Sequence, residues 1–96
     1  MSGEARALTV CVTGRVQGVN YRNFTVEAAR GLKVEGWVRN REDGAVEAAL
    51  RGPGPALADL VGLMRKGPPH GRVDNVDVRS SDHGAAGEPP GDAYVF

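Results

Sequence analysis

Apolar and polar residues alternate with a period of two in several stretches of the chain, a pattern typical of half-buried β-strands. Three such stretches cover residues 8–13, 34–39 and 46–50, and the valines of residues 73–79 predict a fourth strand. An Asp-Gly pair at residues 43–44 separates the second and third stretches and is a strong signal for a hairpin turn. The pattern therefore predicts four strands, of which the second and third are paired.

Between the first and second strands the apolar period changes to that of a helix. The predicted helical stripe consists of Tyr21, Phe24, Thr25, Ala28 and Leu32. Asn20 is a candidate N-cap, and Gly31 is a candidate terminator. We therefore expect a helix that starts at Tyr21 and ends near Gly31.

A second helical pattern follows the third strand. Its apolar stripe consists of Leu57, Leu60, Val61 and Met64. The Gly-Pro-Gly-Pro sequence at residues 52–55 breaks the strand, and Pro55 suits the first turn of a helix, where a missing N–H costs nothing. A Gly-Pro-Pro sequence at residues 67–69 is expected to end this helix.

The order strand, helix, strand, strand, helix, strand (βαββαβ) predicts a ferredoxin-like α+β sandwich, in which an antiparallel sheet of strand order 4-1-3-2 carries both helices on one face. Residues 94–96 (Tyr-Val-Phe) either add a short fifth strand at the edge beside the second strand or stay unpaired. Residues 81–93 are expected to form a flexible loop or tail. We expect a single domain over residues 1–96, with its core at about residues 7–80. This fold hosts many functions and does not decide between them.

The composition narrows the class of protein. Hydrophobic residues make up 41% and charged residues 25%, which is ordinary for a soluble globular domain. Twelve basic residues balance twelve acidic ones, so the net charge gives no indication of nucleic-acid binding. No apolar stretch approaches the roughly 18–20 residues that a membrane helix needs, and no secretory signal is visible. Cys11 is the only cysteine, which fits the cytoplasm, where we expect the protein to be located.

The junction between the first strand and the first helix, GRVQGVNYR at residues 14–22, is the candidate site. Gly14 and Gly18 provide the backbone freedom that a tight loop needs, and successive N–H groups there can converge on an anion. The helix start adds a partial positive charge, and the guanidinium of Arg22 offers a planar fork of donors that matches phosphate oxygens. Taken alone, the same residues also fit an ordinary glycine-bearing loop with a solvated arginine.

Residues 36–40 (GWVRN) end the second strand and can bring Asn40 near this loop, because that strand follows the helix that carries Arg22. A neutral carboxamide both donates and accepts hydrogen bonds, so it can hold a water in line with a bound phosphorus without repelling the anion. The alternative is a turn residue, since Asn is common next to hairpins.

Together, GRVQGVNYR at residues 14–22 and GWVRNREDGAVE at residues 36–47 resemble the acylphosphatase family. The resemblance runs from about Leu8 to about Val78. Two separated motifs at family-like spacing are more specific than either one alone. The resemblance implies a hydrolase acting on acid anhydrides, which converts a small acyl phosphate to a carboxylate and inorganic phosphate.

The resemblance also implies roles for individual residues. Arg22 would bind the phosphoryl group and Asn40 would position the attacking water, without a metal or an organic cofactor. The backbone that would cradle the phosphate oxygens belongs to Val16, Gln17, Gly18, Val19, Asn20 and Tyr21. A carboxylate leaving group and a loose transition state fit this scheme, because positioning and charge stabilisation can then do most of the catalysis. The substrate's own phosphate oxygen can take the water's proton, which predicts a flat pH–rate profile near neutrality.

The other reactive side chains are interpreted as structural. His70 and His83 have no acidic or cysteine partner spaced for a metal site, so both are interpreted as solvated loop residues. Cys11 has no adjacent base and is interpreted as a buried or half-buried thiol. Trp37 is expected to pack on the sheet or beside the site. Asp43 and Glu47 are expected at turn and surface positions. Arg15 and Arg39 are expected to be solvated charges at strand ends, and the alternative is that they raise the positive potential near the pocket.

Two other functions stay open. One is a non-enzymatic ferredoxin-like module that binds an anion, a nucleic acid or a protein. A nucleic-acid reader of this kind needs aromatic and basic residues spread over its open face, and five aromatic residues with zero net charge argue against it. The other is an acylphosphatase-like accessory domain of a larger maturation enzyme that acts on carbamoyl phosphate. For the leading hypothesis we expect a monomer whose partner is a small acyl phosphate, not a nucleic acid or a membrane.

Overall fold

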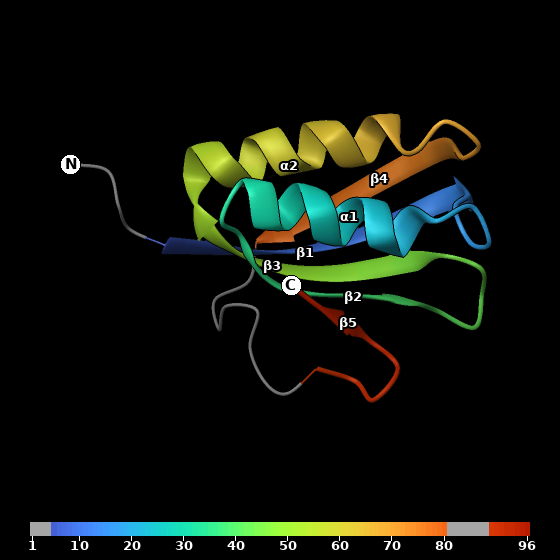
Figure 1. Ribbon diagram of the computed structural model, residues 1–96, viewed down its shortest axis with the longest axis horizontal. Helices are drawn as coiled ribbons and strands as arrows, with labels where there is room; N and C mark the ends of the chain where they lie inside the picture. Colours follow the sequence, from blue (N-terminus) through green and yellow to red (C-terminus); the bar gives the residue numbers. More distant parts are fainter. Residues whose placement is uncertain (1–4, 81–88) are drawn as a thin grey trace.

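The computed structural model describes residues 5–80 and 89–96. The elements in chain order are β1 (Ala5–Arg15), α1 (Tyr21–Gly31), β2 (Glu35–Asn40), β3 (Val46–Pro53), α2 (Gly54–Lys66), β4 (Arg72–Ser80) and β5 (Tyr94–Val95). The strands form one antiparallel sheet in the order β4-β1-β3-β2-β5, and both helices cover the same face of it (Figure 1). The predicted ferredoxin-like α+β fold is therefore confirmed, including the fifth strand at the β2 edge.

The hydrophobic core lies between the helices and the sheet. All four residues of the predicted α2 stripe are buried: Leu57, Leu60, Val61 and Met64. In α1 the buried residues are Tyr21, Thr25 and Ala29, so the stripe runs through Ala29, whereas Ala28 is only half-buried. Phe96, beyond the predicted core boundary at residue 80, also packs against this core.

Helix α1 begins and ends where predicted, but different interactions from those expected stabilise its two ends. Asn20 precedes the helix as predicted, but its side chain does not cap it, because the residue is left-handed (φ 69°) and capping needs an extended conformation. Its Oδ1 instead accepts a hydrogen bond from Asn23 Nδ2 at 2.8 Å. Gly31 is the last helical residue, but the left-handed residue that turns the chain is Lys33 (φ 61°). The bond from Val34 N to Ala29 O (2.9 Å) closes a Schellman motif, with Lys33 at the position that glycine usually takes.

The first strand is also longer than predicted. Gly14 does not end β1, which pairs with β4 as far as Arg15 after a register shift between Thr13 and Gly14. At Gly14 (φ 126°) a Cβ would lie 2.3 Å from the carbonyl oxygen of Arg72, so this close approach of two backbones requires glycine.

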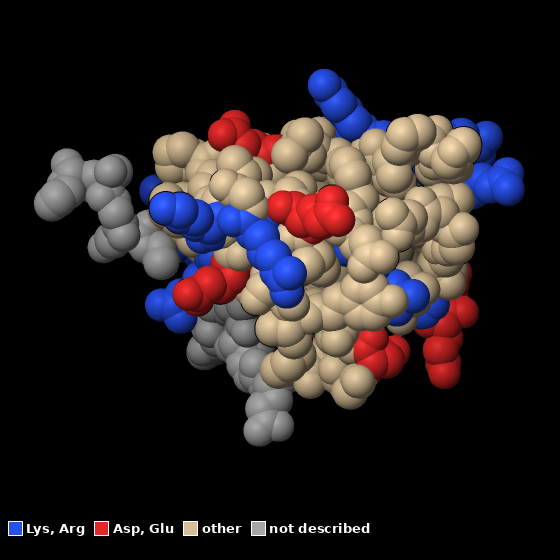
Figure 2. Space-filling model, in the orientation of Figure 1, with Lys and Arg blue, Asp and Glu red and all other residues tan. Residues whose placement is uncertain are grey.

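Three connections gather at one end of the sheet: the β1–α1 loop, the β2–β3 hairpin and the α2–β4 connection (Figure 1). Basic and acidic side chains are interspersed on the face seen in Figure 2, with no broad area of one sign. No helix in the described part of the chain is long and apolar enough to cross a membrane. The end with the three connections is where the candidate site lies.

Candidate active site

A cavity of about 210 Å³ lies where the β1–α1 loop meets the end of β2 and the start of β5. Its lining consists of Val16, Gly18, Asn20, Tyr21, Arg22, Asn23, Asn40 and Tyr94. The fold thus brings both predicted catalytic residues, Arg22 and Asn40, to one cavity. Of the six predicted cradle residues, four line it, and Gln17 and Val19 do not.

The loop at this cavity has two left-handed residues, Gly18 (φ 77°) and Asn20 (φ 69°). Such alternation lets neighbouring N–H groups face one side and form an anion-binding concavity. Within the described residues, the N–H groups of residues 18–20 donate no hydrogen bond to another backbone group. The first helical bond runs from Phe24 N to Asn20 O at 3.0 Å. The loop therefore ends in a helix N-terminus with donors still available to an anion.

The side chain of Gln17 ties the loop to the hairpin that follows β2. Its Nε2 donates hydrogen bonds to the carbonyl oxygens of Arg41 (2.8 Å) and Ala45 (3.0 Å), which belong to the β2–β3 hairpin. Val19 packs against the core. The side chains of these two residues therefore fix the loop from outside the cavity. The sequence shows only that residue 17 carries an amide, so this tie could not be read from it.

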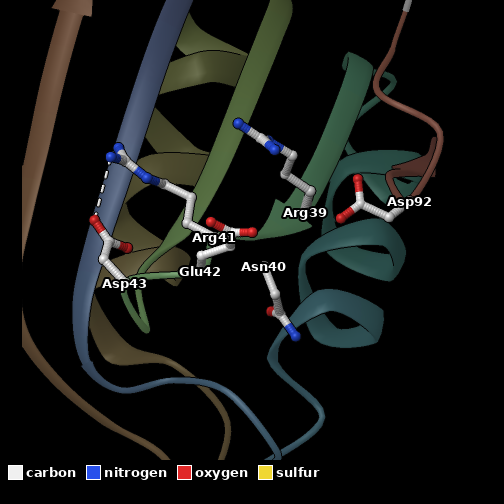
Figure 3. A pocket seen from close by; sticks show the side chains of 6 residues that line it. All are labelled: Arg39, Asn40, Arg41, Glu42, Asp43 and Asp92. Atoms are coloured by element: carbon white, nitrogen blue, oxygen red, sulfur yellow. Dashed lines mark ion pairs between the residues drawn. The ribbon is translucent and has the colours of Figure 1, made fainter.

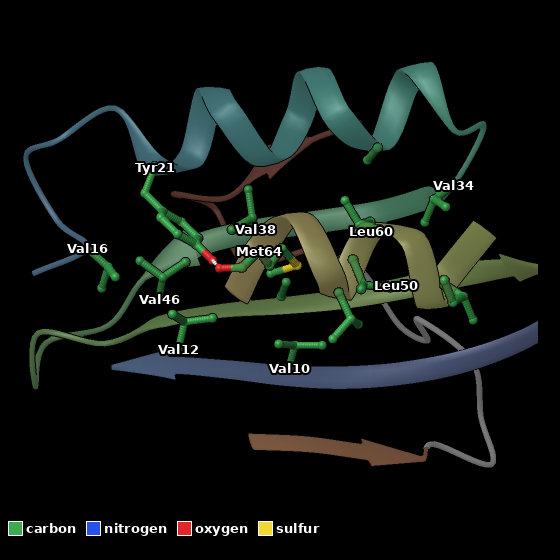
Figure 4. Packing of buried hydrophobic residues seen from close by; sticks show 14 residues of the cluster. Val10, Val12, Val16, Tyr21, Val34, Val38, Val46, Leu50, Leu60 and Met64 are labelled. Atoms are coloured by element: carbon green, nitrogen blue, oxygen red, sulfur yellow. Dashed lines mark hydrogen bonds between the residues drawn. The ribbon is translucent and has the colours of Figure 1, made fainter. Parts of the chain in front are cut away.

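Tyr21 anchors the start of α1 in the core (Figure 4). The side chain is 1% exposed, and its hydroxyl donates a hydrogen bond of 2.7 Å to the carbonyl oxygen of Met64 in the last turn of α2. Burial raises the pKa of the Tyr21 hydroxyl well above its ordinary value. The phenol therefore stays protonated near neutrality and serves as a structural donor rather than as a base.

Asn40 is the last residue of β2, opposite Val46 of β3. Figure 3 shows its side chain pointing away from Arg39 and Arg41 and toward the β1–α1 loop. Its Oδ1 is buried and accepts no hydrogen bond from any described residue. Buried polar atoms nearly always have a partner, so an unpaired acceptor at a cavity wall indicates a place for a water or a ligand.

A second, more open hollow of about 430 Å³ adjoins this cavity at Asn40 (Figure 3). It is also lined by Arg39, Arg41, Glu42, Asp43 and Asp92. Arg41 pairs with Asp43 at 3.2 Å, and Asp43 Oδ1 also accepts a hydrogen bond from Ala45 N, which confirms its predicted role in the turn. Of the two arginines that line this hollow, Arg41 is thus paired with an acidic residue of the same hollow.

Two charged residues were wrongly placed at the solvated surface. Arg39 and Glu47 form an ion pair at 2.9 Å, and their side chains are only 33% and 23% exposed. They lie directly opposite each other on the neighbouring strands β2 and β3. Glu47 lies between Cys11 and Arg39 in the sheet register, and the pair is half-buried. Arg15 is exposed, as expected.

The remaining predicted structural residues lie outside the cavity. Cys11 is half-buried, 3.7 Å from Arg41 Nη1, and Trp37 is half-buried between Ala49 and Val95 in the sheet register. His70 is exposed, and His83 lies outside the described residues. Among the described residues, no three side chains of His, Cys, Asp or Glu are grouped as a metal site would need.

Two residues of the cavity lining, Asn23 and Tyr94, were not predicted as site residues. The ring of Tyr94 in β5 lies over the Arg22 guanidinium, with 4.2 Å between Cζ and the ring centroid. Residues 94–96 were predicted only as a strand at the edge. A tyrosine near the end of a chain carries no signal that it reaches an arginine in the first helix.

Comparison with known proteins gives a consistent result. A model of the family described as acylphosphatase matches residues 8–86. An acylphosphatase of Salinibacter ruber is 47% identical over 81 residues, covering 84% of this chain and 85% of the relative. An acylphosphatase of Rhodospirillum rubrum is 51% identical over 73 residues, covering 76% and 80%. The crystal structure of acylphosphatase from Bacillus subtilis superposes with a TM-score of 0.78 at 39% identity, covering 80% of this chain and 86% of that chain.

Proposed function

This chain belongs to the acylphosphatase family of hydrolases, and we propose that its cavity cleaves the carboxyl–phosphate bond of small acyl phosphates through Arg22, Asn40 and the loop backbone. The observation that carries the proposal is the unpaired, buried Oδ1 of Asn40 in the same cavity as the Arg22 guanidinium. The guanidinium of Arg22 can bind an anion, and the carboxamide of Asn40 can orient a water. A loop that only binds anions would need the guanidinium but not the carboxamide.

In this mechanism the phosphoryl group lies against the loop, with its oxygens on the backbone N–H groups and on Arg22. The developing charge in the transition state is then held by donors that are already oriented. Asn40 Oδ1 accepts a hydrogen bond from the attacking water. Because displacement at phosphorus is in line, the acyl oxygen must leave on the side opposite that water.

The proposal needs no proton acceptor from the protein. The water oxygen forms a bond to phosphorus, the bond between phosphorus and the acyl oxygen breaks, and its electron pair leaves with the carboxylate. The water's proton passes to a phosphate oxygen of the substrate. Among the described residues, no Asp, Glu, His, Lys or Cys lines the cavity, which supports this route and the flat pH–rate profile it predicts near neutrality.

The proposal extends to a monomeric, cytoplasmic protein of one domain that works without a metal or an organic cofactor. The single cysteine supports the cytoplasmic location. The loop, helix end and arginine support catalysis without a metal or an organic cofactor, because together they offer enough donors for a phosphate without a cation.

The deciding assay is phosphate release from benzoyl phosphate by the wild type, Arg22→Ala and Asn40→Ala, with and without EDTA. We expect Arg22→Ala to lower kcat/KM by about 10²–10³-fold and Asn40→Ala to lower kcat by a similar factor, with EDTA causing no loss. Inorganic phosphate should still inhibit Asn40→Ala, because its binding loop and arginine remain intact.

Matched controls are Arg30→Ala, an exposed arginine in the last turn of the same helix, and Asn75→Ala, an exposed asparagine on β4. Both should retain activity. Full activity in folded Arg22→Ala would refute the assignment. Phosphate binding without any hydrolysis by the wild type would instead favour a non-enzymatic anion-binding module.

A further inference from the structure

The aromatic ring of Tyr94 covers the guanidinium that the proposed mechanism depends on. The two groups are 4.2 Å apart, from Arg22 Cζ to the ring centroid, and both residues line the cavity. Tyr94 is 38% exposed, so its ring is not held in place by the core. An arginine above an aromatic face at this distance is attracted by the ring's negative face.

The ring reaches Arg22 because β5 pairs with β2. Tyr94 lies opposite Val38, Val95 lies opposite Trp37, and Phe96 N donates a hydrogen bond of 3.0 Å to Gly36 O. The strand that ends in Asn40 thereby also positions Tyr94. The single strand β2 thus contributes to the placement of both Asn40 and Tyr94 in the cavity that Arg22 lines.

The nature of this contact suits a phosphate-binding arginine. A carboxylate would order the guanidinium but would neutralise its charge and occupy its N–H donors. No described Asp or Glu forms an ion pair with Arg22. A ring face restricts the side chain while leaving the in-plane N–H groups and the charge available to an anion.

We propose that Tyr94 is a positioning residue that holds the Arg22 guanidinium in its phosphate-binding orientation through the face of its ring. This inference rests on the proposed role of Arg22 and makes the short strand β5 part of the active site. The ring, not the hydroxyl, carries the effect. The substrate therefore meets an arginine that is already ordered, which lowers the entropy lost on binding.

The test compares Tyr94→Leu, which keeps an apolar side chain but removes the π face, with Tyr94→Phe, which keeps the face and removes the hydroxyl. For benzoyl phosphate hydrolysis we expect Tyr94→Leu to lower kcat/KM by about five- to thirtyfold and to raise the inhibition constant of inorganic phosphate by a similar factor. Tyr94→Phe should keep both kcat/KM and the inhibition constant of phosphate within about twofold of the wild-type values.

Two controls separate positioning from a general weakening of β5. Val95→Thr changes the neighbouring residue on the other face of the strand, which is 55% exposed, and should leave both constants near those of the wild type. The second control is a double-mutant cycle, with the slow variants assayed at higher enzyme concentration. In the Arg22→Ala background, Tyr94→Leu should cause less than about a twofold further loss, because the group it positions is gone. Circular dichroism verifies that each variant is folded.

The inference is overturned if Tyr94→Leu is as active as the wild type, if its full loss persists in the Arg22→Ala background, or if Tyr94→Phe loses as much as Tyr94→Leu. The last result would assign the effect to the hydroxyl. Failure of the proposed function is recognised separately, because folded Arg22→Ala alone would then retain its activity.

Discussion

One wall of the cavity comes from a single stretch of chain, whereas the other comes from two strands that are distant in sequence. The loop wall consists of Val16, Gly18, Asn20, Tyr21, Arg22 and Asn23. The sheet wall consists of Asn40 at the end of β2 and Tyr94 at the start of β5. The loop wall is formed by residues that follow one another in the sequence, from the turn of the loop to the first turn of α1. In the sheet wall, Asn40 and Tyr94 come together only because β5 pairs with β2 in a particular register.

The two walls also differ in how they are anchored. Tyr21 fixes the loop wall to the core, since it is 1% exposed and bonded to Met64 O. Tyr94 of the sheet wall is 38% exposed, in a strand of two residues. The loop wall is therefore anchored in the buried core, whereas the Tyr94 part of the sheet wall is on a short strand at the sheet edge. We expect damage to the first to unfold the protein and damage to the second to lower activity.

The largest effect is expected from Gly14→Ala, at the base of the loop wall. At φ 126° a Cβ would lie 2.3 Å from Arg72 O and 2.7 Å from Asp74 N, and these are backbone atoms that cannot move independently of the β1–β4 pairing. We expect the free energy of unfolding in urea to fall by about 3 kcal/mol or more.

The control for this substitution is Gly62→Ala, at an exposed position in α2 where a Cβ would meet nothing within 4 Å. It should raise the free energy of unfolding by up to about 1 kcal/mol, because alanine favours a helix. An unchanged urea midpoint in Gly14→Ala would show that the loop wall does not depend on this close approach.

A smaller effect is expected from Gln17→Ala, which cuts the direct tie between the loop and the β2–β3 hairpin. The variant loses the hydrogen bonds of 2.8 and 3.0 Å to Arg41 O and Ala45 O. Both oxygens keep another donor, from Gly44 N and Arg41 N, so the loss in free energy of unfolding should be about 1 kcal/mol. The KM for benzoyl phosphate should rise severalfold, because the loop is less ordered before binding.

Gln17→Glu makes this test sharper. A carboxylate of the same size cannot donate to two carbonyl oxygens, and it adds a negative charge near an anion site, so it should raise KM more than Gln17→Ala does. Asn75→Ala, on the exposed strand β4, is the control. An unchanged KM in both Gln17 variants would show that this tie to the hairpin does not order the loop for substrate binding.

The same difference between local and long-range structure explains what could be predicted from the sequence. The alternation around Val10 and Val12 and the stripe of Leu57 and Leu60 predicted their elements correctly, because burial of one face directly imposes that period. Residues 94–96 were too short to carry a period. Their pairing was decided by the open edge of β2, where β5 is the second hydrogen-bonded neighbour after β3.

Within the site, the loop and Arg22 were found from their residues, and Asn40 from its place at a strand end. Their meeting in one cavity follows from the fold, and their catalytic roles stay predictions. Tyr94 was missed because its contact depends on the β2–β5 register. Asn20 is at the N-cap position as predicted, but its side chain does not cap the helix, because the residue is left-handed and residue type alone does not reveal that conformation. Residue identity thus indicated the chemistry available, and register decided which groups touch.

The smallest predicted effect concerns how deeply the loop wall is anchored. Because burial raises the pKa of the Tyr21 hydroxyl in the folded protein, the unfolded chain loses this proton first as the pH rises past the ordinary tyrosine pKa of about 10. The buried, protonated hydroxyl of Tyr21 therefore contributes its full share to the free energy of unfolding below about pH 10, and this share declines above that pH. Between about pH 9 and about pH 10.5 the wild type should lose about 0.8 kcal/mol more free energy of unfolding than Tyr21→Phe does.

Urea unfolding of both proteins across this pH range isolates the effect, since all other titrating groups are common to the two and cancel in the difference. Tyr21→Phe should be about 1 kcal/mol less stable near neutrality, because Met64 O loses its hydrogen bond, and this gap should close as the pH rises. Parallel curves would mean that the hydroxyl titrates equally in the folded and unfolded chain. The loop wall would then not be anchored in a water-excluding core, and the contrast with the exposed ring of Tyr94 would disappear.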